Sequence, residues 1–197
     1  MLSDIALCSH ALIKLGADAI TSFEDGSFES EVANGLYSMV RDSVISAHPW
    51  TFATGQFQLS LLTAEPIADY AYAFQLPADF LRALSVGAGT DSGRGTDYRI
   101  HERRVHANVN EAVLTYIFRP DETTWPPFFD AVLIDRLTAE FCMPITDSAS
   151  RTEALQRVAD RTLRNAKTVD SQQQTPDQIT EFALISARGV ISAREGG

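Results

Sequence analysis

The chain has 197 residues, of which 45% are hydrophobic, and this is enough for one domain with a sizeable core. It carries 26 acidic and 16 basic residues, a net charge of −10, which disfavours a protein that binds duplex DNA tightly through its phosphates. No apolar run approaches the roughly 18 residues of a membrane span, and no N-terminal secretion signal is evident, so we expect a cytosolic protein with no membrane contact.

Two helices are expected first. Apolar residues at helical spacing predict one over about 3–15, with Ser3 as its cap and Gly16 as its stop. A second helix is predicted over about 28–47, after a polar loop. The residues expected on its buried face are Val32, Leu36, Met39, Val40, Val44 and Ala47.

A proline and two aromatic residues follow the second helix. Pro49 ends that helix around His48, because proline lacks a backbone donor and disfavours helical geometry in the residue before it. Trp50 and Phe52 then bury roughly 150–250 Å² each between the helices and the segment that follows. We interpret Pro49, Trp50 and Phe52 as a structural junction rather than a ligand-stacking site.

The middle of the chain, about 55–118, changes character. Short runs with partial period-two alternation predict a small antiparallel sheet with a glycine-rich loop at 87–97. His101 and His106 flank the sequence Glu-Arg-Arg-Val, which we interpret as the turn of a hairpin with the two histidines as exposed residues.

Helical patterns return after the sheet. A segment at about 127–143 is apolar nearly all round, which indicates a central, buried helix. The next helix, about 151–170, begins with a capping-box pattern at Ser150 and Glu153. The face opposite its apolar stripe is basic, and three of its residues are candidate inter-subunit contacts: Arg157, Arg161 and Arg164.

The fold class expected from these elements is α+β, mainly α. About four helices form a bundle with a small antiparallel β-sheet inserted over about 55–118, and this domain covers residues 1–171. Residues 172–197 form a C-terminal extension, in which a polar linker precedes a fresh helix start at Thr175-Pro176.

Recognisable catalytic and metal-binding patterns are missing from the sequence. Cys8 and Cys142 lie in apolar helical patterns and are expected to be reduced core thiols. The histidines lack metal-ligand spacing, and the glycine-rich loop lacks both a dinucleotide fingerprint and a phosphate-binding lysine. The sequence therefore predicts a protein without metal or cofactor that is not an enzyme.

Several segments in one order resemble the head-to-tail adaptor proteins of tailed phages. The most specific are HPWTFA (48–53), LPADF (76–80) and PPFFDAVLIDRLTAE (126–140), within a likeness that covers about residues 5–170. The similarity is to the tail tubular protein A group and to the adaptors of gene transfer agents.

This resemblance implies a structural protein at the head–tail junction of a phage or gene transfer agent particle, assembled in the bacterial cytoplasm. It implies a ring, usually of twelve copies, that binds the portal protein above and a tail or stopper protein below. DNA would pass through the ring without specific binding, along a channel wall expected to be neutral or negative. The extension lies beyond the part of the chain that carries the resemblance, and its composition of apolar residues beside arginines predicts that it docks on the portal through Ile179, Phe182, Leu184, Ile185, Arg188, Val190, Ile191 and Arg194. The alternative is that this segment packs on its own bundle.

Two other function classes stay open from the residues alone. One is a different virion assembly protein, such as a tail-completion factor. The other is a small regulatory or enzymatic domain without a recognisable site.

Overall fold

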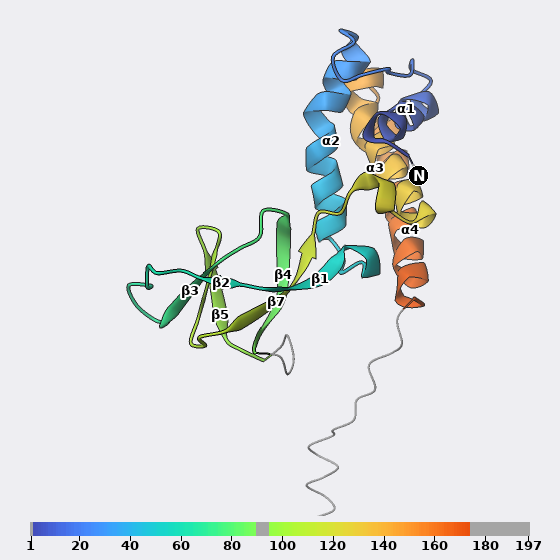
Figure 1. Ribbon diagram of the computed structural model, residues 1–197. Helices are drawn as coiled ribbons and strands as arrows, with labels where there is room; N and C mark the ends of the chain where they lie inside the picture. The colour runs from blue at the N-terminus through green and yellow to red at the C-terminus, as the bar shows by residue number, and fades with distance from the viewer. Residues whose placement is uncertain (1, 90–94, 174–197) are drawn as a thin grey trace, which may run out of the picture.

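The computed structural model describes residues 2–89 and 95–173, which form four α-helices and seven β-strands in an α+β fold (Figure 1). The helices are α1 (Asp4–Leu15), α2 (Phe28–Ser46), α3 (Pro127–Thr146) and α4 (Ala149–Ser171). Short 3-10 turns, η1 (Thr51–Ala53) and η2 (Glu122–Thr124), mark the entry to the strands and the exit from them. Helix α3 packs against α1, α2 and α4 and is the centre of the bundle, as predicted.

Local capping fixes most of the helix ends. The Ser3 side chain accepts a hydrogen bond from the Ala6 backbone N–H, and Gly16 adopts a φ of 80° that ends α1, which confirms both predicted signals. The predicted capping box of the last helix was wrong. Ser148 caps α4 instead, accepting a hydrogen bond from the Arg151 N–H, so that helix begins two residues earlier than expected.

The predicted buried face of α2 was only partly correct. Val40 and Val44 are buried, but Met39 is 61% exposed and Ala47 is also exposed. The face that enters the core is turned by a fraction of a helical turn and includes Tyr37, whose ring is buried while its hydroxyl donates a hydrogen bond to Glu122. A tyrosine whose hydroxyl is hydrogen-bonded can occupy a core position, and a prediction of the buried face from aliphatic residues alone does not include it.

The strands form two antiparallel sheets. They are β1 (Thr54–Gln58), β2 (Ser60–Leu61), β3 (Tyr72–Gln75), β4 (Phe80–Ala88), β5 (Tyr98–His101), β6 (Arg104–Ala107) and β7 (Ala112–Phe118). One sheet has the order β1-β7-β4 and the other β2-β3-β6-β5. Their inward residues, among them Phe74 and Val105 from one sheet and Val86 and Leu114 from the other, form one buried cluster.

The predicted fold class, a mainly α bundle with a small inserted sheet, was therefore wrong. The insertion holds seven strands in two sheets with their own hydrophobic core, separate from the core of the helices. It was underestimated because its strands are short and three of them, β1, β2 and β5, contain no fully buried residue, so that few apolar core residues fall together in the sequence. The predicted loop at 87–97 lies partly outside the described residues, while Gly87 and Ala88 still belong to β4.

The strands lie to one side of the lower end of the bundle (Figure 1). The chain enters them at β1, just after α2 ends, and leaves them at β7, just before α3 begins. Because β1 and β7 are paired, with Thr54 opposite Ile117, the insertion is joined to the helices by two adjacent strands.

Candidate functional site

The junction between helices and sheets is built around Trp50. Helix α2 ends at Ser46, close to the predicted stop, and the Trp50 side chain is fully buried in the helical core. Its indole Nε1 donates a hydrogen bond to the Val44 carbonyl at 3.2 Å. The Trp50 ring meets the Phe129 ring edge to face at a centroid distance of 5.2 Å, and the Phe52 ring meets the Phe129 ring at 4.8 Å. An aromatic cluster thus joins the end of α2 to the start of α3.

A buried carboxylate at the end of α4 holds the same junction. Asp170 is 1% exposed and accepts hydrogen bonds from the Thr51 backbone N–H at 3.1 Å and from the Thr51 hydroxyl at 2.8 Å. His48 Nε2 lies 3.7 Å from the same carboxylate. Asp170 therefore connects the last turn of the helical bundle to the first turn that leads into the sheets.

The pKa of His48 is lowered below its ordinary 6.5. Burial disfavours the charged ring, and the nearby positive charge of Lys167 lowers the pKa further. The Asp170 carboxylate raises the pKa, but by less than the other effects lower it.

This lowered pKa predicts a pH dependence of stability. A histidine that titrates at a lower pH when folded binds more protons in the unfolded chain, so its contribution to stability falls as the pH drops below about 6.5. We expect the free energy of unfolding to decrease more between pH 7.5 and 5.5 in the natural protein than in the His48→Gln variant. Urea unfolding at both pH values measures this, and equal decreases would contradict the assignment.

A second polar cluster ties α2 to the segment between β7 and α3. Arg119 forms a bidentate pair with Asp42 at 2.5 and 3.0 Å, and Arg41 contacts both Asp42 at 3.0 Å and Glu122 at 2.9 Å. Burial alone would raise the pKa of Asp42, but hydrogen bonds from Arg119 and Arg41 lower it below its usual value. The pKa of Tyr37 is raised by burial and by the neighbouring Glu122 carboxylate. These contacts anchor the segment after β7 to α2, and the contacts between Thr51 and Asp170 anchor the segment before β1 to α4.

The three candidate inter-subunit arginines share the outer face of α4 and are exposed. Arg157 pairs with Glu153 one turn earlier on the same helix. Among the described residues, Arg161 and Arg164 have no hydrogen-bond or ion-pair partner, so this face presents two uncompensated positive charges. The predicted portal-docking residues, at positions 179–194, lie outside the described residues.

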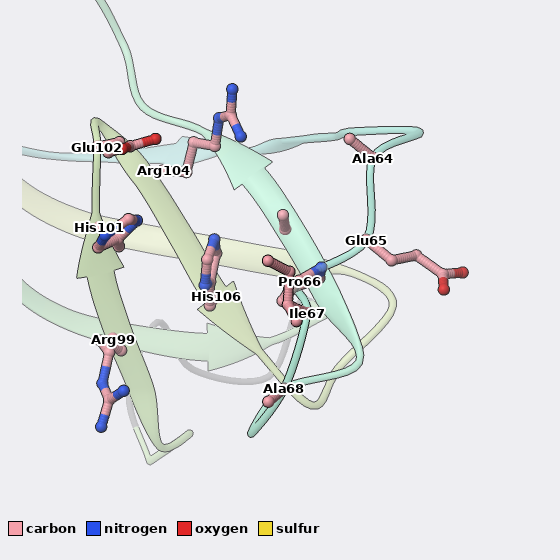
Figure 2. A pocket seen from close by; sticks show the side chains of 11 residues that line it. Ala64, Glu65, Pro66, Ile67, Ala68, Arg99, His101, Glu102, Arg104 and His106 are labelled. Atoms are coloured by element: carbon pink, nitrogen blue, oxygen red, sulfur yellow. The ribbon is translucent and has the colours of Figure 1, made fainter.

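A shallow cleft of about 300 Å³ lies over the outer face of the four-stranded sheet (Figure 2). It is lined by His101, Arg104 and His106 from the β5–β6 hairpin and by Pro66 and Ile67 from the β2–β3 loop. The hairpin confirms the expectation for the two histidines, although His106 is only half-exposed. The cleft itself was not predicted, because it depends on a long loop folding over the sheet.

Sequence reasoning also missed Asp170 and the Arg41 cluster. Asp170 did carry a signal, since it follows Ala166 by four residues on the buried face of α4. A charged residue at a core position of an apolar stripe indicates a specific buried partner.

No arrangement in the described part of the chain points to enzyme activity. Within it, no three His, Cys, Asp or Glu side chains are grouped so as to hold a metal ion. Cys8 and Cys142 are buried free thiols, and burial, with the nearby Asp4 charge, raises the pKa of Cys8 to about 12. None of the described helices is both long and apolar enough to cross a bilayer.

Neither the comparison with protein-family models nor the comparison with curated proteins gives a match to this chain.

Proposed function

We propose that this chain is a structural head-to-tail adaptor of a tailed phage or gene transfer agent particle. It would form a ring beneath the portal, connect the capsid to the tail and line the channel through which DNA passes. Its described residues offer exposed surfaces for contacts with other proteins, and no arrangement among them points to a reaction.

The observation that supports this proposal best is the contact between two of the motifs that carry the resemblance. Trp50 of HPWTFA and Phe129 of the α3 motif are far apart in the sequence, yet their rings are in edge-to-face contact at 5.2 Å. The third motif, LPADF, is held at the end of the sheets where β7 leads to the helices, because the Asp79 carbonyl accepts a hydrogen bond from the backbone N–H of Arg119, whose side chain pairs with Asp42 of α2. The motifs therefore form the joint between bundle and sheets, which is a reason for them to occur together.

The charge distribution is compatible with this role. Arg161 and Arg164 expose unpaired positive charge on the outer face of α4, on a chain whose net charge is −10. Unlike charges on different faces of one subunit favour heterologous contacts between copies, which close into rings when the rotation allows. The net negative charge limits adhesion to the DNA that passes through.

The test is assembly with the portal protein encoded beside this chain. We expect the mixture to give a complex with a ring of adaptor copies below the portal, seen by electron microscopy and by mass in solution. The adaptor alone is expected to remain a smaller species or to form rings. Failure to bind the portal or any neighbouring particle protein would contradict the proposal.

A deletion locates the portal contact. Removing residues 175–197 should leave a folded protein with an unchanged melting temperature that no longer attaches to DNA-filled heads. The matched control replaces the same residues with a glycine–serine segment of equal length, which should behave like the deletion. If the truncated protein still joins heads to tails, the portal contact lies elsewhere on the chain.

A further inference from the structure

The cleft over the four-stranded sheet has a basic floor that follows from strand register. Arg99 lies opposite His106 and His101 lies opposite Arg104, so four basic side chains form two adjacent cross-strand pairs. Because side chains alternate along a strand, all four lie on the face opposite Val105, which is buried in the core between the sheets. Figure 2 shows these side chains rising from two neighbouring strands.

The loop that covers this floor is held in place. Arg99 donates a hydrogen bond to Asp69 at 3.1 Å, and Asn108 accepts one from the Ala71 N–H at 2.9 Å. The same loop supplies an apolar wall, where Pro66 lines the cleft and Ile67 is fully exposed. Pro66 and Ile67 thus give the cleft an apolar wall directly beside its basic floor.

The charges of the cleft are only partly satisfied within the described chain. Arg99 is paired with Asp69, whereas Arg104 has no ion-pair or hydrogen-bond partner there. Two carboxylates, Glu65 and Glu102, also line the cleft, and Figure 2 shows the Glu65 carboxylate extending away from the histidines. A polyanion such as duplex DNA would be repelled by these acids over its whole length, whereas a single carboxylate at Arg104 meets less of this repulsion.

The edge of the sheet beside the cleft is open. Strand β5 is the last strand of its sheet and, in the part of the chain that the structure describes, pairs only with β6. An edge strand presents backbone N–H and C=O groups that another extended chain can pair with. This feature favours a polypeptide over a small free anion as the occupant.

We propose that the cleft and the β5 edge together bind an extended segment of a partner protein that carries a carboxylate two residues away from an apolar side chain, so that both lie on the face of the segment that meets the cleft. The carboxylate contacts Arg104 and the two imidazoles, the apolar side chain covers Pro66 and Ile67, and the backbone pairs with β5. This binding site is separate from the surfaces invoked for the adaptor role and does not depend on that role.

The test uses three synthetic peptides, acetylated and amidated: Val-Thr-Glu-Thr-Val, whose valines share a strand face with the glutamate, its lysine analogue, and a glutamate peptide that is N-methylated at alternate residues. Binding is followed by nuclear magnetic resonance at the His101 and His106 rings and at the β5 amides of the full chain. The glutamate peptide is expected to bind at least tenfold more tightly than either of the others. Equal affinity for all three peptides, or no binding of the glutamate peptide at 5 mM, would overturn the proposal.

Two charge-reversal variants identify the contact. Arg104→Glu should remove the preference for glutamate over lysine. The matched control is Arg103→Glu, because Arg103 lies in the β5–β6 turn, where its guanidinium donates to the Pro77 carbonyl at 3.0 Å and does not line the cleft. That control should keep the preference. If Arg104→Glu also keeps the preference for glutamate over lysine, a carboxylate-bearing segment is not the ligand. The same conclusion follows if a 12-base-pair duplex DNA shifts the same resonances more strongly than the glutamate peptide does.

Discussion

Replacing Trp50 with alanine is expected to lower the free energy of unfolding by about 3–5 kcal/mol, the range for large aromatic truncations in a core. The indole is fully buried and contacts Phe129 at 5.2 Å, and its Nε1 satisfies the Val44 carbonyl near the end of α2. The truncation therefore leaves a cavity at the point where helices and sheets join. Urea unfolding followed by far-ultraviolet circular dichroism measures the effect.

A second aromatic residue provides the control. Phe28 begins α2 and is 57% exposed, so Phe28→Ala should change stability by no more than about 0.5 kcal/mol. If Trp50→Ala unfolds at the same urea concentration as the natural protein, the ring contributes little to the core and its surroundings must differ from those described.

The helical part of the fold was predictable because its signals are local. Ser3 and Gly16 act on backbone groups within one turn of the helix they bound, so their effect can be read from neighbouring residues. Pro49 acts in the same way, and α2 ends just before it. These predictions needed no knowledge of what the helices pack against.

The extent of the sheets was not predictable in this way. Strand β2 has only two residues, Ser60 and Leu61, and both are exposed. It exists because its backbone pairs with β3, a contact between segments joined by a long loop. The inner residues of the two sheets become a core only after the sheets stack, so no single window of sequence contains that core.

The sequence predicted where candidate contact surfaces lie better than it predicted which residues pair on them. The outer face of α4 could be assigned from helical spacing, and the exposure of Arg161 and Arg164 agrees with it. The pairing of Arg157 with Glu153 was open to the same reasoning but was not predicted. The basic floor of the cleft required the hairpin register, which the sequence indicates only through the short turn between β5 and β6.

Replacing Asp170 with alanine is expected to lower the free energy of unfolding by about 2–4 kcal/mol, because hydrogen bonds to a charged group contribute roughly 1.5–3 kcal/mol each. The substitution leaves the Thr51 N–H without its acceptor and the Thr51 hydroxyl with only the exposed Gln173 Oε1 at 3.2 Å, which frees the turn that leads into β1. Removing the carboxylate also relieves the cost of burying a charge, so the net loss is smaller than the sum of both bonds.

A readout at the junction separates this local role from general destabilisation. In Asp170→Ala, hydrogen exchange of the Thr51 amide should become faster by more than the change in global stability accounts for, since its acceptor is gone. The matched control is Asp160→Ala on the same helix, where the carboxylate is exposed and lies 3.7 Å from Arg136. That variant should leave both stability and Thr51 exchange nearly unchanged. If Asp170→Ala behaves like Asp160→Ala, α4 does not hold the junction, and the aromatic cluster around Trp50 must position the sheets without it.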